Sequence, residues 1–282
     1  MALNMPTFYK RTGSALVFAA IMLTGLLWDN TWPFLLLICI INALCLREFY
    51  DLLQLIDKDK HWPAWLHISM QVLSLFLLVF LALPAGFSPV QKPLTLVFAL
   101  TPLVAPALLM AATLPKKTAL PALLHGASGL FYITLPMILL AKMRHHDLLL
   151  PMAIFALIWI NDTMAYIVGS FIGKTPFSPI SPKKTWEGTA GGAILTIIAA
   201  AVYGYLPVIY TIHDSSLTDW VMIALCVAVA GTLGDLLESK LKRIADVKDS
   251  GTMMPGHGGA LDRFDSVLIA IPVVYVYYSI CM

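Results

Sequence analysis

The chain has 282 residues, of which 59% are hydrophobic and 12% are charged, and its mean hydropathy is +0.83. Soluble globular proteins average about 45–50% apolar and about 25% charged residues, so this composition excludes an ordinary soluble domain and indicates an integral membrane protein. The net charge of +2 is too small to suggest a nucleic-acid-binding surface, and we expect no nucleic-acid partner.

Nine apolar segments approach or exceed the length of about 20 residues that a membrane-spanning helix needs. In chain order they are Ser14–Trp28, Pro33–Leu46, Leu66–Phe87, Leu94–Leu114, Ala122–Lys142, Leu148–Gly173, Thr189–Tyr210, Trp220–Arg243 and Ala260–Met282. The first two are shorter than the others. The sequence therefore predicts an all-α, polytopic membrane protein with about nine transmembrane helices.

Between the second and third of these segments, residues 47–61 are more polar but keep an apolar stripe at helical spacing. The stripe consists of Phe49, Leu52, Leu53 and Ile56. Such a pattern predicts a helix that lies in the membrane interface, with partner docking as the alternative.

The connections between nine spans carry Lys and Arg very unequally. Fourteen of the 18 fall on one side of the membrane, whereas the other side receives only Lys92, Lys142 and Arg144, with Arg263 left uncounted inside a motif. Because cytoplasmic loops are enriched in Lys and Arg, the N-terminus is expected in the cytoplasm and the C-terminus outside. The location expected is the inner membrane of a bacterium.

The organisation expected is an N-terminal transmembrane region, 1–143, with about five helices and the interfacial helix 47–61. A C-terminal catalytic region, 144–282, would contribute about four helices with cytoplasmic motif loops. We expect the two regions to form one integrated domain.

Acidic residues inside apolar spans are the first candidates for chemistry, because one ionised side chain at the bilayer centre costs roughly 2.5–3.5 kcal/mol. Asp162 lies in the sixth span, Asp235 and Glu238 in the eighth, and Asp262 and Asp265 in the ninth. A short connection makes the eighth and ninth helices antiparallel neighbours, and residues at i, i+3 share a helix face. Two acidic faces should therefore meet near the cytoplasmic headgroups.

Carboxylates gathered in a low dielectric repel one another, and a bound cation relieves the repulsion. Oxygen ligands of this kind suit Mg²⁺, which takes its remaining ligands from water and substrate phosphates. We predict a Mg²⁺ site at Asp235, Asp262 and Asp265. The alternative is internal ion pairing with Lys242, Arg243 or Arg263.

Two segments resemble phosphate-binding loops. Gly256, Gly258 and Gly259 flank His257 immediately before the last helix, where glycine amides and a helix N-terminus favour an anion. In Ser178–Gly188, two lysines, Lys183 and Lys184, precede a tryptophan. A purely topogenic role explains the lysines of this second loop but not its remaining residues.

These motifs together resemble the C-terminal signature of phosphatidate cytidylyltransferases, the CDP-diacylglycerol synthases of bacterial membranes. The matching motifs are Ser239-Lys-Leu-Lys-Arg243, Lys248-Asp249, Pro255-Gly-His-Gly-Gly259 and Asp262-Arg-Phe-Asp265, together with Trp159-Ile-Asn-Asp162, Ser181–Gly188, and Gly234-Asp235 followed by Glu238-Ser239. The N-terminal half offers only a loose REFYDLL segment, Arg47–Leu53. Met254 and Ala260 depart from the usual pattern at packing positions.

The resemblance implies an enzyme that condenses CTP with phosphatidic acid, in the presence of Mg²⁺, to give CDP-diacylglycerol and pyrophosphate. It also implies metal association of the acids at 235, 262 and 265, and a homodimer in the lipid bilayer. The candidate catalytic residues are Asp235, Asp262, Asp265, Lys248, Asp249 and His257. The candidate substrate-binding residues are Asp162, Lys183, Lys184, Ser239, Lys242, Arg243, Gly258, Gly259 and Arg263.

Two other functions remain open at this stage. A CTP-dependent lipid kinase would phosphorylate a polyprenol or phytol hydroxyl and would need a base, for which Asp162 and His257 are the candidates. An ion-coupled transporter would spread buried acids across the bilayer and show two repeat halves, and the sequence displays neither feature.

Overall fold

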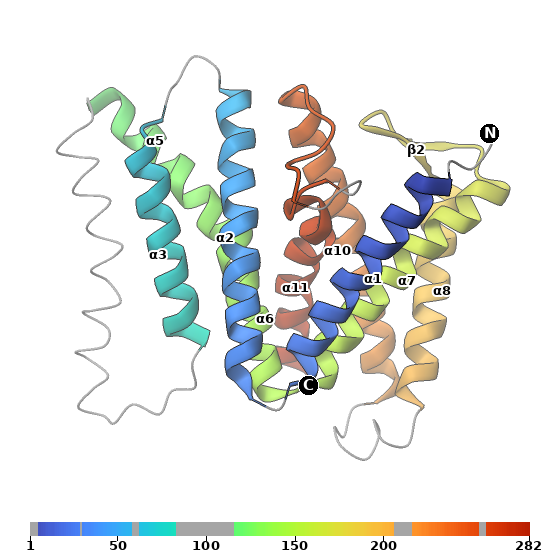
Figure 1. The fold of residues 1–282 in the computed structure, drawn as a ribbon. Helices are drawn as coiled ribbons and strands as arrows, with labels where there is room; N and C mark the ends of the chain where they lie inside the picture. Colours follow the sequence, from blue (N-terminus) through green and yellow to red (C-terminus); the bar gives the residue numbers. More distant parts are fainter. Residues whose placement is uncertain (1–4, 29, 58–61, 83–115, 206–215, 254–257) are drawn as a thin grey trace. The chain divides into compact units, whose positions relative to one another are not determined.

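The computed structural model describes residues 5–28, 30–57, 62–82, 116–205, 216–253 and 258–282. Within these ranges the chain is almost entirely helical (Figure 1). Seven helices in the described ranges are long and apolar enough to cross a membrane. The protein is therefore an all-α, multi-pass membrane protein, as the composition predicts.

The chain forms two compact units. Unit one comprises 1–145 and 245–261, and unit two comprises 146–244 and 262–282. The boundary near residue 145 agrees with the predicted regions 1–143 and 144–282, except that 245–261 belongs with the first unit. The expectation of one integrated domain concerns the arrangement of the two units and stays a prediction.

Unit one is built from five helices and a π-helical turn in its described part. They are α1 (Met5–Leu27), α2 (Thr31–Ile56), α3 (Ala64–Ala82), α5 (Lys116–Gly129), η1 (Leu130–Thr134) and α6 (Leu135–His146). A chain of buried hydrogen bonds ties α2, α3 and η1 together: Asn42 Nδ2 donates to Ser74 Oγ over 2.6 Å, and the hydroxyls of Ser74 and Thr134 are 2.7 Å apart. Buried polar groups stabilise a membrane helix bundle when they are paired in this way.

Helix α2 differs from the sequence prediction. The short span Pro33–Leu46 and most of the interfacial segment 47–61 form one continuous helix of 26 residues. Half of the apolar stripe is buried, since Phe49 is 5% exposed and Leu52 is 1% exposed, whereas Leu53 and Ile56 are partly exposed. The expected interfacial position of this segment stays a prediction. Neither Gly nor a second Pro interrupts the helix after Pro33, so nothing in the sequence stops it before Asp57.

The predicted count of nine spans stays a prediction. Helix α1 contains only a short apolar stretch, Val17–Leu27, and the predicted span Leu94–Leu114 lies outside the described residues. Inside unit one, Arg144 donates from Nε to the Leu26 carbonyl and from a terminal nitrogen to the Trp28 carbonyl, both over 2.8 Å. Arg144 thus satisfies carbonyls at the C-terminal end of α1.

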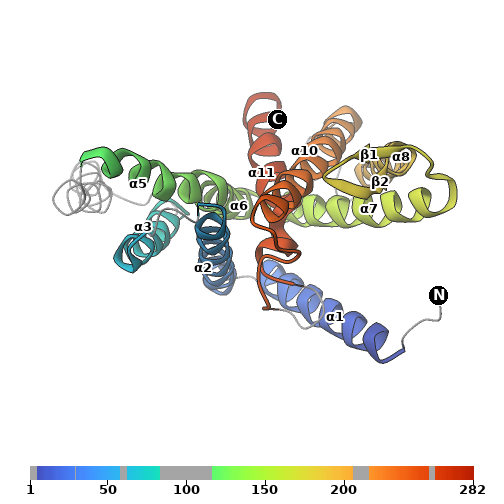
Figure 2. The same cartoon turned by 90° about the horizontal axis from the view of Figure 1, so that it is seen from above.

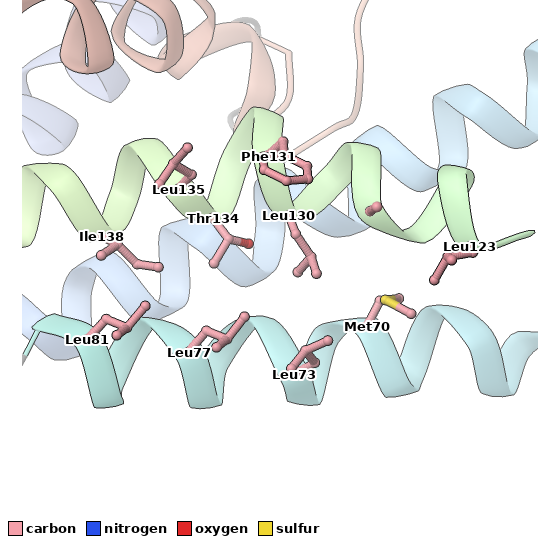
Figure 3. Close-up of a pocket in the computed structure, with 11 residues that line it drawn as sticks. Met70, Leu73, Leu77, Leu81, Leu123, Leu130, Phe131, Thr134, Leu135 and Ile138 are labelled. Atoms are coloured by element: carbon pink, nitrogen blue, oxygen red, sulfur yellow. The ribbon is translucent and has the colours of Figure 1, made fainter. Parts of the chain in front are cut away.

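Unit one also contains an apolar cavity of about 270 Å³ between α3 and the α5–η1–α6 span (Figure 3). From α3, Met70, Leu73 and Leu77 point toward Leu130 and neighbouring residues of the facing span. No charged side chain is present among the described residues that line the cavity. It therefore lacks the groups needed to bind or activate a phosphate.

Unit two contains four long helices and a short β-hairpin. They are α7 (Leu149–Ile172), β1 (Pro176–Ser178), β2 (Ser181–Thr185), α8 (Trp186–Gly204), α10 (Leu217–Ile244) and α11 (Leu261–Cys281), whose first residue, Leu261, falls in unit one. Helices α7 and α8 lie side by side with the hairpin at one end (Figures 1 and 2). A Cβ at Gly192 would lie 2.8 Å from both the Asn161 carbonyl and the Ala165 Cβ, so glycine permits this close packing.

Candidate functional site

The β-hairpin is anchored to the start of α8 by two side chains. Thr185 Oγ1 accepts the Gly188 N–H over 3.1 Å and caps the helix. The Glu187 carboxylate accepts the backbone N–H of Lys174 and of Thr175 over 3.1 Å and also the Thr175 hydroxyl over 2.9 Å. The hairpin that carries Lys183 and Lys184 is therefore anchored at its two ends, before β1 and after β2, and no strand was predicted here from the sequence.

The two lysines of β2 have different surroundings. Lys184 forms an ion pair through Nζ with Asp235 Oδ2, and the two side chains are 27% and 28% exposed. The other oxygen of Asp235 accepts the Ser239 hydroxyl over 3.2 Å, one turn further along α10. Lys183 is exposed, because neighbouring residues of a strand point to opposite faces. The hairpin therefore directs one lysine to an acid that the sequence analysis placed in the site.

A second ion-paired group lies one turn beyond Asp235 on α10. Lys242 Nζ donates to Asp262 Oδ1 over 2.6 Å and also pairs with Glu238. Glu238 is fully buried, and its Oε1 has no hydrogen-bond partner among the described residues. The alternative of internal ion pairing is thus present at Asp262. Its other suggested partners, Arg243 and Arg263, are exposed.

Asp162 and Asp265 complete the group in unit two. Asp265 lies close enough to Asp235 and Asp162 for their carboxylates to repel one another electrostatically. Asp162 also interacts favourably with the positive charge of Lys184. Asp265 Oδ1 accepts the Ser266 N–H over 2.6 Å. Acids from α7, α10 and α11 therefore gather beside the hairpin lysine, as the helix spacing predicted for α10 and α11.

Gly234 allows α10 and α11 to approach at this level. A Cβ at Gly234 would collide with the Asp265 carbonyl oxygen and would lie 3.1 Å from the Ser266 Cα. At Gly231, one turn earlier, a Cβ would meet only the Ser266 Cβ at an ordinary 3.6 Å. Close contact of the two backbones is therefore confined to the turn that carries Asp235.

We expect Gly234→Ala to destabilise the protein by about 1–3 kcal/mol, because the added methyl group forces the two helices apart. Turnover should fall as well, since Asp235 follows directly in the chain. Gly231→Ala is the matched control and should leave both properties near wild type. Melting temperature and activity in detergent would check this prediction. Equal melting temperatures and activities of the two variants would contradict the close contact between α10 and α11 at Gly234.

The carboxylates of this group are the predicted ligands of Mg²⁺. In the described ranges, no group of three or more His, Cys, Asp or Glu side chains is placed to hold a metal ion. Mg²⁺ in nucleotide enzymes, however, is commonly held by one or two carboxylates together with water and substrate phosphates. Asp235 and Asp265 supply oxygen donors of this type, so the residues present fit such a shared site.

The remaining predicted residues lie in the unit-one segment 245–261. Lys248 and Asp249 are exposed, Gly259 is buried, and Gly258 has a positive φ of 83° that favours glycine. His257, like Gly256, lies outside the described residues. The amides that follow, those of Ala260 and Leu261, donate to a glutamate for which the sequence analysis predicted no role, Glu48 of α2.

The fold and site together define a class of protein: a multi-pass membrane protein in which acidic side chains of three helices gather beside a lysine of a short hairpin. Residues 9–281 match the family model described as the cytidylyltransferase family. The chain belongs to the cytidylyltransferase family.

Three similar proteins are each named phosphatidate cytidylyltransferase. That of Haemophilus influenzae is 37% identical over 135 residues, which are 48% of this chain and 47% of the relative. That of Bacillus subtilis is 46% identical over 124 residues, 42% of this chain and 43% of the relative. That of Synechocystis is 43% identical over 133 residues, 46% of this chain and 43% of the relative. The chain spans about half the length of the curated relatives it matches.

Proposed function

We propose that the protein is a phosphatidate cytidylyltransferase of phospholipid biosynthesis. It transfers the cytidylyl group of CTP to phosphatidic acid and forms CDP-diacylglycerol and pyrophosphate. The observation that carries this proposal is the Lys184–Asp235 pair beside Asp162 and Asp265 in a membrane protein of the cytidylyltransferase family. The names of the three similar proteins support the same reaction.

The reaction needs charge compensation more than proton transfer. A phosphate oxygen of phosphatidic acid attacks the α-phosphorus of CTP, a new P–O–P bond forms, and the bond to pyrophosphate breaks. The attacking oxygen is already ionised near neutral pH, so it needs no strong general base. Two polyanions must nevertheless approach each other, and fixed positive charge lowers the barrier to that approach.

Lysines of unit two supply part of this charge. Lys184 has a long and partly exposed side chain, so rotation about its bonds brings Nζ from Asp235 to a phosphate oxygen. Lys242 is held more firmly between Glu238 and Asp262, and it neutralises these acids rather than the substrate. Ser239 orients the Asp235 carboxylate through its hydroxyl.

Mg²⁺ is part of the proposal. Asp235 and Asp265 would hold it. Asp262 is the third predicted ligand, and it would have to give up its hydrogen bond with Lys242 to bind the ion. When bound, the ion supplies positive charge to the triphosphate and to the departing pyrophosphate. We propose the substrate-binding and catalytic roles expected from the sequence for Arg243, Lys248, Asp249, His257, Gly258, Gly259 and Arg263. For Lys183, which is exposed, we propose no more than a weak, screened interaction with substrate.

The second candidate, a CTP-dependent lipid kinase, is favoured by the exposed carboxylate of Asp162 beside Lys184, because a hydroxyl acceptor needs a base. The lipid acceptor distinguishes the two enzymes. Purified protein in mixed micelles with CTP should consume phosphatidic acid and ignore diacylglycerol and polyprenol. Consumption of a lipid alcohol instead of phosphatidic acid would favour the kinase. An ion-coupled transporter would turn over neither lipid.

We also propose that the protein lies in the inner membrane of a bacterium as a homodimer, with its N-terminus and motif loops in the cytoplasm. CTP then arrives from the cytoplasm and phosphatidic acid from the leaflet. The uneven distribution of Lys and Arg supports this orientation.

Cysteines introduced at Ser216 and Ser250 test the orientation, because these residues flank the long helix α10. In a background without the four native cysteines, a membrane-impermeant thiol reagent should label Ser250→Cys only from the cytoplasmic side. It should label Ser216→Cys only from the opposite side. Labelling of both positions from one side would overturn the orientation.

A further inference from the structure

Glu48 of α2 binds both ends of the segment 250–261, and all of these residues belong to unit one. Its Oε1 accepts the N–H of Ala260 over 2.9 Å. Its Oε2 accepts the N–H of Leu261 over 2.8 Å and the hydroxyl of Ser250 over 2.9 Å. One carboxylate therefore joins Ser250 to two residues, Ala260 and Leu261, that come about ten positions later in the sequence.

Two glycines, Gly251 and Gly259, lie directly against this carboxylate. A Cβ at Gly251 or at Gly259 would collide with the carboxylate oxygens of Glu48. Glycine at both positions lets the backbone approach the carboxylate from two sides. The contact with Glu48 thus accounts for both glycines.

The two amides bound by Glu48 are at the start of α11. The first N–H groups of a helix have no partner within the helix, and they carry partial positive charge. A carboxylate forms short, charge-assisted hydrogen bonds with such groups. Glu48 therefore occupies an anion-binding helix N-terminus of the kind that the sequence analysis assigned to a substrate phosphate.

We infer that Glu48 is a positioning residue for cytidylyl transfer: its carboxylate joins Ser250 to Ala260 and Leu261 and so fixes the first residue of α11, directly before Asp262. The kinetic part of this inference rests on the proposed function. The hydrogen-bonding part does not, and it can be measured without substrate.

Hydrogen–deuterium exchange of the intact protein tests the contact itself. A peptide that contains Ala260 and Leu261 should gain about two rapidly exchanging amides in Glu48→Ala, because α11 offers these N–H groups no other acceptor. Glu48→Gln keeps one carbonyl oxygen and should give an intermediate uptake. Asp51→Ala, one turn further along the exposed side of α2, is the matched control and should exchange like wild type. Equal uptake in wild type and Glu48→Ala would overturn the inference.

Kinetics test the consequence for the reaction. In Glu48→Ala we expect kcat to fall by about 10²-fold, the scale of a misplacement of about 1 Å, with KM for CTP changed less than about threefold. Glu48→Gln should recover part of the lost kcat, and Asp51→Ala should match wild type. A structural role alone predicts a lower melting temperature with unchanged kcat in the folded fraction, and that result would overturn positioning.

A third possible outcome is a lower KM for CTP rather than a lower kcat. If Glu48 only shields the helix N-terminus from a substrate phosphate, then Glu48→Gln should lower KM for CTP and leave kcat intact, which would also overturn positioning. Inactive wild type would refute the proposed function, whereas the exchange experiment would still decide whether Glu48 holds Ala260 and Leu261.

Discussion

Asp265→Asn is expected to lower the rate of cytidylyl transfer by about three orders of magnitude while the protein stays folded. The substitution keeps the size of the side chain and one oxygen that can accept the Ser266 N–H. It removes the charge that would hold Mg²⁺ beside Asp235. Loss of one charge-stabilising group in a transition state costs about 10²–10³-fold, and loss of a metal costs more.

Activity and melting temperature across a Mg²⁺ titration measure this effect. Removing one of several mutually repelling carboxylates should leave the melting temperature unchanged or raise it. Asp219→Asn is the matched control, because Asp219 is an acid at the opposite end of α10 that binds the Tyr277 hydroxyl over 2.8 Å. Its turnover should stay within about threefold of wild type, because its hydrogen-bond partners, Ser216 and Tyr277, are not among the proposed site residues. If Asp265→Asn melts much lower yet retains Mg²⁺-dependent turnover, the carboxylate is structural.

Lys184→Met is expected to lower kcat/KM for CTP by about 10²-fold. Methionine keeps most of the length of the aliphatic chain and removes only the ammonium group. One fixed positive charge that contacts a phosphoryl oxygen is worth about 10²–10³-fold in a transition state. The protein should remain folded, since Asp235 is partly exposed and keeps the Ser239 hydroxyl as a partner.

Lys183→Met provides the matched control in the neighbouring position of the same strand. The structure pairs Lys184 with an acid and leaves Lys183 exposed, with no ion pair found for it in the described ranges. We expect kcat/KM for Lys183→Met to stay within about threefold of wild type, the scale of a screened surface charge. Equal losses of kcat/KM in the two variants would show that both lysines contact substrate. If both variants instead kept wild-type kcat/KM, the lysines would serve only to orient the protein in the membrane.

Much of the site could be predicted because it depends on helix spacing and hydropathy. The acids of α10 and α11 share helix faces, and a short connection made those helices neighbours. The ion pairs could not be predicted in the same way. Lys242 was one of three suggested partners for Asp262, and its selection depends on the side-chain length and direction along α10.

The rest could not be predicted, because it depends on tertiary contacts that local patterns do not record. The stripe with Phe49 and Leu52 is equally compatible with lipid, an interface or a protein core, and only the packing shows that these two residues are buried. The residues of β2 are too few and too polar for a strand pattern, and side-chain hydrogen bonds to Glu187 stabilise the hairpin. Glu48 lies in the REFYDLL segment that the resemblance included, yet its partners are more than 200 residues away.

The position of the label that enters the lipid tests the proposed function most directly. In this assay, purified protein is incubated with phosphatidic acid, Mg²⁺ and CTP. The CTP is labelled at the α-phosphate in one reaction and at the γ-phosphate in a parallel reaction. We predict that α-label enters the lipid fraction, that γ-label leaves entirely as pyrophosphate, and that Asp265→Asn loses both products together. Transfer of γ-label to lipid, without α-label, would contradict cytidylyl transfer and identify a kinase.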